Sequence, residues 1–252
     1  MTTTRRFFLE DMVETTDALA LSGAEFRHLS NVLRITEGTE IEVLNGKGLT
    51  CRAVVESITK NLAILRPLSW DNNLNESPLK ITLIQGMTKL MKPELVVEKA
   101  TELGVNKIFF YETERSVLKK GALTNSKSKK YTAKLARLKR VAASAIKQCG
   151  RSVVPEVGFI TLSDALKQEA LLKVVLHDEG KVSLKDILSN LPEGSNEVVL
   201  LIGSEGGFTE AELKDICEKG FVAGGFGKRV LRAETAAIAA VTALQYALGD
   251  MG

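Results

Sequence analysis

The segment Val198–Leu213 constrains the fold more than any other part of the chain. Val198–Ile202 is wholly apolar, as expected of a parallel strand that is buried on both faces. Gly203-Ser-Glu-Gly-Gly207 follows, and glycines permit a tight turn and the close approach of a ligand to the backbone. Thr209 and Glu212 then form the capping box that begins a helix. A strand, glycine turn and helix in this order predict a ligand site at the carboxyl edge of a sheet.

The rest of the chain after residue 79 alternates between strand and helix patterns. Strands are expected at 81–85, 107–111, 174–176 and 198–202, and helices at 93–103, 128–148, 183–191, 209–219 and 235–248. This alternation predicts an α/β layer sandwich with a mostly parallel sheet.

The first seventy residues have a different pattern. Short strands are expected at 6–9, 40–44, 51–58 and 62–68, with Asn45-Gly46 as a turn and one helix at about 25–33. Residues 71–78 contain turn formers and almost nothing apolar, so we place a linker there. The chain is therefore expected to have two domains, 1–72 and 73–252.

Composition excludes several classes of protein. No run approaches the ~18 uncharged apolar residues that a membrane span needs, so no membrane association is expected. Three dispersed cysteines and two histidines predict neither a disulfide framework nor a metal site. Arg5-Arg6-Phe7-Phe8 imitates a twin-arginine export signal, but acidic residues follow where an apolar stretch should stand. A cytoplasmic location fits best.

Positive charge is concentrated in one segment. Residues 115–155 contain twelve lysines and arginines and no acid, while the remaining chain has nine more acids than bases. An apolar stripe from Tyr131 to Cys149 at helical spacing leaves most of these bases on the other faces of a helix. Such a localised cationic surface indicates a polyanion partner. A solvated helix face with a loop is the alternative reading.

A second glycine-rich segment, Gly224–Thr235, leads into a helix that is apolar on nearly every face. That helix needs burial within the domain or across a subunit interface. Neither glycine segment has the spacing of a dinucleotide fingerprint or of a phosphate-binding loop.

Together these two segments resemble the signature motifs of the RsmE family. The motifs are Gly203-Ser-Glu-Gly-Gly-Phe-Thr-Glu-Ala-Glu and Gly227-Lys-Arg-Val-Leu-Arg-Ala-Glu-Thr-Ala, and further matches include His28–Arg34, Glu98–Val105 and Gln148–Glu156. Ser204 and Phe226 depart from the family's usual proline and leucine, and no charged group is lost. The family belongs to the SPOUT class and methylates N3 of a uridine in 16S ribosomal RNA.

The resemblance implies a fold, a cofactor and an assembly. It implies an N-terminal PUA-like β-barrel, a C-terminal domain with a trefoil knot, and a homodimer whose substrate is 16S rRNA, within or outside the small ribosomal subunit. S-adenosylmethionine is the implied cofactor. Its pocket would involve Leu176, Ile202, Gly203, Gly206, Gly207, Phe226, Gly227, Val230, Leu231 and Ala233.

The resemblance also implies roles for charged residues. Arg232 could stabilise the uracil anion, and Glu205 or Glu234 could accept its proton. Helix capping is an equal alternative for Glu234, and His177 could serve as a base, although a structural role is more common for a lone histidine. Family positions suggest RNA contacts by Arg6, Arg34, Arg115 and Arg151. Pairing with Glu37 is the alternative for Arg34.

Two other functions stay open at this point. One is a SPOUT methyltransferase that acts on transfer RNA or on a ribose 2′-hydroxyl. The other is a non-catalytic RNA-binding protein with a degenerate methyltransferase domain, against which the presence of both glycine motifs argues. Cofactor binding separates the binding protein from both enzymes.

Overall fold

The computed structural model describes residues 5–14, 16–73, 75–88, 92–113, 128–178, 180, 182–191, 194 and 196–252. Its contacts divide the chain into two compact units. Unit 1 comprises Met1–Glu76 and Ala143–Val154, and unit 2 comprises Ser77–Ala142 and Pro155–Gly252. The segment 143–154 therefore packs with unit 1, which the expected division at residue 72 did not include.

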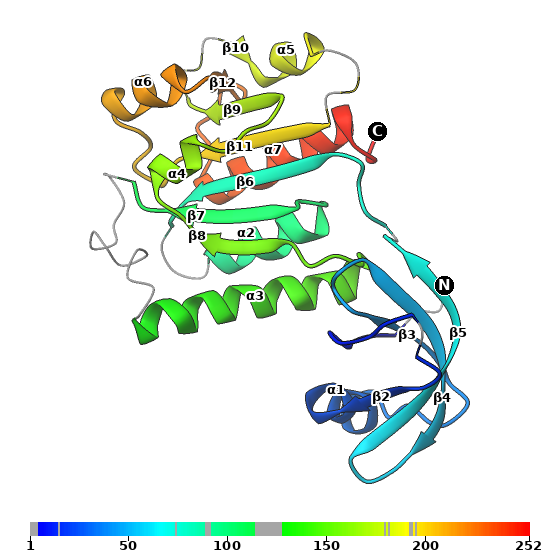
Figure 1. Cartoon of the computed structure of the whole chain (residues 1–252). Helices are drawn as coiled ribbons and strands as arrows, with labels where there is room; N and C mark the ends of the chain where they lie inside the picture. Colours follow the sequence, from blue (N-terminus) through cyan, green and yellow to red (C-terminus); the bar gives the residue numbers. More distant parts are fainter. Residues whose placement is uncertain are drawn as a thin grey trace. The chain divides into compact units, whose positions relative to one another are not determined.

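Within the described residues, unit 1 contains a five-stranded sheet in the order β1-β3-β4-β5-β2 (Figure 1). Its strands are β1 (Arg6–Phe8), β2 (Leu19–Ser22), β3 (Glu40–Leu44), β4 (Leu49–Ile58) and β5 (Leu62–Asn72). Helix α1 (Gly23–Arg27) continues into the π-helix η1 (His28–Val32), and Phe26 and Leu29 bury their side chains in the core of the unit. The expected Asn45-Gly46 turn is confirmed, because Asn45 Oδ1 accepts hydrogen bonds from the amides of Lys47 and Leu49.

The expected linker is more ordered than its composition indicated. Strand β5 continues to Asn72, and Asn73 and Asn75 adopt left-handed backbone conformations with φ of 52° and 56°. The Glu76 carboxylate then accepts hydrogen bonds from the amides of Ser152 and Val153, at 2.9 Å each. Turn-forming residues here adopt defined backbone conformations, since Asn tolerates the left-handed region.

Unit 2 contains a seven-stranded sheet in the order β10-β12-β9-β11-β6-β7-β8 within the described residues (Figure 1). Its strands are β6 (Lys80–Gly86), β7 (Lys107–Tyr111), β8 (Glu156–Phe159), β9 (Leu172–Leu176), β10 (Val182–Ser183), β11 (Glu197–Ile202) and β12 (Val222–Gly225). Neighbouring strands pair in parallel. The predicted parallel sheet is confirmed, and its carboxyl edge gathers the ends of β6, β9, β11 and β12.

Helices cover both faces of this sheet. They are α2 (Lys92–Glu102), α3 (Lys129–Cys149, whose residues from 143 onward belong to unit 1), α4 (Leu162–Leu166), α5 (Leu184–Ser189), α6 (Glu210–Glu218) and α7 (Ala233–Leu248). Helices α2 and α7 pack on each other, and α7 also contacts β6 and β11. Helices α4 and α6 share a second hydrophobic cluster with Val175, Val199 and Leu201. No helix in the described ranges is both long and apolar enough to cross a membrane.

Sequence patterns missed the short elements. Strands β2, β8, β10 and β12 and helix α4 were not expected. Strand β12 reads Val-Ala-Gly-Gly, and glycine is depleted in strands. Its glycine is required by tertiary structure, because a Cβ at Gly225 would lie only 2.8 Å from the carbonyl oxygen of Gly180.

Candidate active site

The glycine turn after β11 forms the first wall of the site. Strand β11 ends at Ile202, and α6 begins after Thr209, whose hydroxyl accepts from the Glu212 amide while the Glu212 carboxylate accepts from the Thr209 amide. The predicted capping box is therefore confirmed. Within the turn, the Gly207 amide donates to the Ser204 carbonyl, and Gly207 has a φ of 65°, which favours glycine.

Three side chains from β6 and the end of β7 hold this turn. The Gln85 amide nitrogen donates to the Gly203 carbonyl at 3.0 Å, and the Tyr111 hydroxyl donates to the Ile202 carbonyl at 3.2 Å. The hydroxyls of Thr113 and Ser204 lie 2.8 Å apart, so the serine that stands in place of the family's proline gains a hydrogen bond. Burial, with a smaller contribution from the Glu212 charge, raises the pKa of Tyr111 well above 10, which keeps its hydroxyl a donor at neutral pH.

The second wall is the loop between β12 and α7. It begins close to the first residues after β9, because a Cβ on Gly180 would collide with the backbone nitrogen of Gly225. Gly227 has a φ of 82°, and Arg232 is the N-cap of α7 with an extended backbone. The loop therefore lies across the carboxyl edge of the sheet before α7 packs beneath it.

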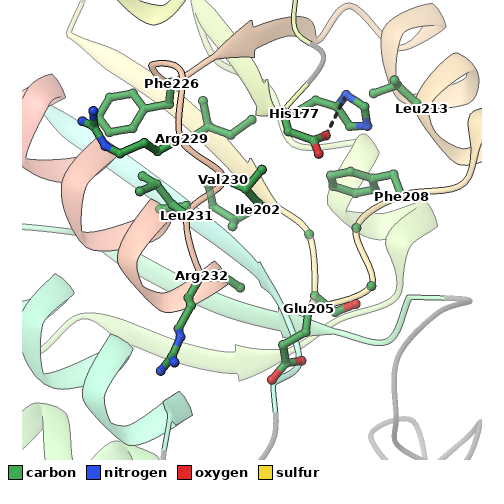
Figure 2. A pocket seen from close by; sticks show the side chains of 18 of the residues that line it. His177, Ile202, Glu205, Phe208, Leu213, Phe226, Arg229, Val230, Leu231 and Arg232 are labelled. Atoms are coloured by element: carbon green, nitrogen blue, oxygen red, sulfur yellow. Dashed lines mark ion pairs between the residues drawn. The ribbon is translucent and has the colours of Figure 1, made fainter.

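The two walls enclose a pocket of about 690 Å³, within the usual size range of a small-molecule site. Figure 2 shows Phe226, Val230 and Leu231 opposite Phe208 and Leu213, with Glu205 and Arg232 towards one end. All ten residues expected to bind the cofactor line it: Leu176, Ile202, Gly203, Gly206, Gly207, Phe226, Gly227, Val230, Leu231 and Ala233. His177 also lines the pocket, with Nδ1 3.5 Å from a carboxylate oxygen of Asp178.

The charged groups expected to act in catalysis do not pair with one another. Arg232 and Glu205 line the pocket, whereas the buried Glu234 does not. Arg232 makes no ion pair with Glu205 or Glu234, all three being described residues. Both carboxylates pair with Lys92 instead. Its Nζ lies 3.4 Å from Glu205 Oε1 and 3.3 Å from Glu234 Oε2.

Lys92 was missed by the sequence reasoning. It is the first residue of α2, which follows β6 along the chain. The strand-end rule that located the glycine turn applies equally to the end of β6. The charged residue that follows the end of β6 could therefore have been predicted to reach the site.

The arginines expected to bind RNA have different environments. Arg6 binds Glu42 at 2.7 Å and donates to the carbonyls of Lys147 and Gln148 at the C-terminus of α3. Arg151 is only 2% exposed and binds Glu76, with Nη2 2.8 Å from Oε2. These contacts favour structural roles for both residues, because each guanidinium would have to leave its partner to bind a phosphate, and that of Arg151 is buried as well.

The other two arginines differ again. Arg34 is exposed, and its expected alternative partner, Glu37, accepts a hydrogen bond from the Ile58 amide at 2.8 Å. Arg115 lies outside the described residues.

The basic helix α3 has the expected apolar stripe, with Leu138, Ala142 and Ala145 buried. Several of its cations are paired with carboxylates or partly buried. Arg137 binds Glu94, and Lys147 binds Glu25. Burial lowers the pKa of Lys134, whose Nζ lies 3.3 Å from the Met87 sulfur. The exposed cations of the described part of the segment are Lys129, Lys130, Arg137, Lys139 and Arg140, of which Arg137 is paired with Glu94.

Family models match both units of the chain. An RNA methyltransferase domain matches residues 75–245, and an RNA methyltransferase PUA domain matches residues 21–68. The first match includes every strand of the seven-stranded sheet, and the second lies within the part of the chain that forms the five-stranded sheet.

Individual relatives are similar over nearly the whole chain. The ribosomal RNA small subunit methyltransferase E of Bacillus subtilis is 32% identical, over 96% of each chain. The solved structure of that enzyme from Neisseria gonorrhoeae, bound to S-adenosylmethionine, is 33% identical, covers 99% of this chain and 100% of its own, and has a TM-score of 0.86. A Legionella pneumophila structure with the same bound cofactor has the same TM-score at 32% identity and covers 98% of this chain and 99% of its own. The protein therefore belongs to the RNA methyltransferase family of ribosomal RNA small subunit methyltransferase E, as its two glycine motifs predicted.

Proposed function

We propose that this protein transfers a methyl group from S-adenosylmethionine to N3 of a uridine in 16S ribosomal RNA. The observation that carries the proposal is the single pocket into which both glycine motifs place their residues. The relatives named above, an enzyme of the small-subunit rRNA and two structures with this cofactor, support the substrate and the cofactor.

The residues of the pocket fit S-adenosylmethionine. Leu176, Ile202 and Leu231 supply apolar walls for an adenine ring, and burial of that ring supplies affinity. The turn between Gly203 and Gly207 presents backbone groups without side chains, which suits close contact with polar parts of the ligand. Glu205 and Arg232 lie towards one end of the pocket (Figure 2), and the reacting uracil is proposed to enter there.

Chemistry at uracil N3 requires loss of a proton. When bound, S-adenosylmethionine supplies an electrophilic methyl group and leaves as S-adenosylhomocysteine. A carboxylate, Glu205 in this arrangement, takes the N3 proton, and the electron pair of the N–H bond forms the new N3–carbon bond. The Arg232 guanidinium stabilises the negative charge that develops on the neighbouring imide oxygen. Glu234 does not line the pocket. Its part in this arrangement is therefore to support the residues that do.

The finer features of the fold and assembly belong to the same proposal. The resemblance of the two glycine motifs supports a chain threaded as a trefoil knot, in which Gly180 would pass close to Gly225 and Gly86 close to Ser204. The unit 1 sheet is proposed to be a PUA-like β-barrel that holds RNA, with Arg34 and the exposed cations of α3 contacting phosphates. Ile238, Ala239 and Ala243 of α7 are half-buried, which supports a homodimer through this helix. Action on ribosomal RNA implies a cytoplasmic location.

Transfer of a labelled methyl group tests the proposal. The purified protein is incubated with methyl-labelled S-adenosylmethionine and 16S rRNA, with transfer RNA as the comparison substrate. Label in 16S rRNA is the expected result. Cofactor binding without transfer to any RNA would contradict catalysis, and label in transfer RNA alone would contradict the substrate.

A further inference from the structure

Lys92 joins two carboxylates that come from the two walls of the pocket. Its ammonium lies 3.4 Å from Glu205, in the glycine turn, and 3.3 Å from Glu234, in the first turn of α7. Glu205 lines the pocket and Glu234 does not. One cation thus connects a carboxylate that faces the substrate space to one that lies behind it.

Of the two carboxylates, Glu234 is the more firmly held. Glu234 is 8% exposed and belongs to a helix of sixteen residues that packs on α2 and β6. Its Oε2 atom is buried and accepts no hydrogen bond from the described residues. A buried carboxylate needs a compensating charge, and Lys92 supplies it together with the amide groups of the first turn of α7. Glu234 is therefore suited to hold Lys92 in place.

The Glu205 end is the more exposed one. Glu205 is in a glycine-rich turn, and its side chain is 30% exposed against 10% for Glu234. Without a cation between them, two carboxylates within reach of one nitrogen would repel each other, and the more exposed one would turn away. Removal of Lys92 would therefore shift Glu205 from the position in which Lys92 binds it.

We propose that Lys92 is a positioning residue for the methyl transfer. Glu234 fixes Lys92, Lys92 holds Glu205 towards the pocket, and Glu205 receives the proton from uracil N3. This inference rests on the proposed function and adds a residue to it. It also assigns different tasks to the two carboxylates, with Glu205 as the proton acceptor and Glu234 as the anchor.

The same helix provides a matched control. Lys99 also lies between two carboxylates, with Nζ 2.7 Å from Glu98 and 3.0 Å from Glu102. None of these three residues lines the pocket. Lys99→Met therefore removes an equivalent doubly paired lysine from α2 without touching the site.

The experiment compares Lys92→Met, Lys92→Arg and Lys99→Met. Single-turnover rates are measured at saturating 16S rRNA and S-adenosylmethionine, and cofactor affinity is measured by calorimetry. General base catalysis contributes about 10²–10⁴-fold, so Lys92→Met, which displaces the base, is expected to lose about 10–10²-fold in rate. Its cofactor affinity should hold. Lys92→Arg should keep most of the rate, and Lys99→Met all of it.

A second variant tests the charge relation directly. Adding Glu234→Gln to Lys92→Met removes the repulsion, so the double variant should be faster than Lys92→Met alone. A double variant that is no faster would overturn the proposal, as would a wild-type rate in Lys92→Met, a parallel fall in cofactor affinity or an equal loss in Lys99→Met. An inactive wild-type protein would overturn the proposed function as well, whereas an active wild type beside an equally active Lys92→Met overturns this inference alone.

Discussion

Gly86→Ala tests whether the packing of β6 against the glycine turn sets the geometry of the pocket. Gly86 ends β6, and a Cβ there would collide with the backbone nitrogen of Ser204 and lie 2.6 Å from the carbonyl carbon of Gly203. The clash is with backbone, so no change of rotamer relieves it. The turn would have to retreat by roughly 1 Å, and a misplacement of that size can cost about 10²-fold in rate.

Two effects are therefore expected of Gly86→Ala. Overpacking of this kind costs about 1–3 kcal/mol of stability, which thermal unfolding detects. Cofactor affinity by calorimetry should fall about tenfold or more, which corresponds to at least ~1.4 kcal/mol. Gly158→Ala is the control, because a Cβ at Gly158 meets only the Phe109 ring, at 3.2 Å, in a strand far from the pocket in the sheet order. Wild-type affinity in Gly86→Ala would refute the reasoning.

Three further predictions concern the charged and polar groups. Arg232→Lys and Arg232→Ala should bind the cofactor normally and lose about 10²–10³-fold in single-turnover rate; a parallel loss of cofactor affinity would make Arg232 a scaffold residue. Tyr111→Phe removes the bond to the Ile202 carbonyl and should cost about 1–3 kcal/mol of stability. Since burial raises the Tyr111 pKa well above 10, the wild type should lose stability as the pH rises above about 10, and Tyr111→Phe should lose less. Reversing the charges of Lys130 and Arg140 should make the salt dependence of RNA binding shallower by about 0.7 per lost phosphate contact on single-stranded RNA. An unchanged slope in that titration would leave these cations without an RNA contact.

The parts of the fold that the sequence predicted are those determined by local patterns. Continuous apolar runs located β7 and β11, and the Thr209–Glu212 capping box located the start of α6. The two glycine motifs located the pocket residues because strand ends in a parallel sheet share one edge. The short strands β10 and β12 carry no such pattern, since tertiary contacts such as that between Gly180 and Gly225 form them.

Pairing of charges was the part of the site that could not be predicted. Arg151 matches a family position for RNA contact, yet Glu76, seventy-five residues away, binds its guanidinium. Lys92 lies more than a hundred residues from both Glu205 and Glu234. No periodicity or spacing reports which cation meets which carboxylate at such separations, because the fold alone brings them together.

The nucleoside that the protein produces is the most direct test of its proposed function. 16S rRNA from cells that lack the enzyme is treated with the purified protein and S-adenosylmethionine, digested, and analysed by mass spectrometry against untreated RNA. The proposed function predicts one new N3-methyluridine, formed by the wild type and lost in Arg232→Ala. A 2′-O-methylated nucleoside, a methylated base other than uracil, or no new modification would contradict it.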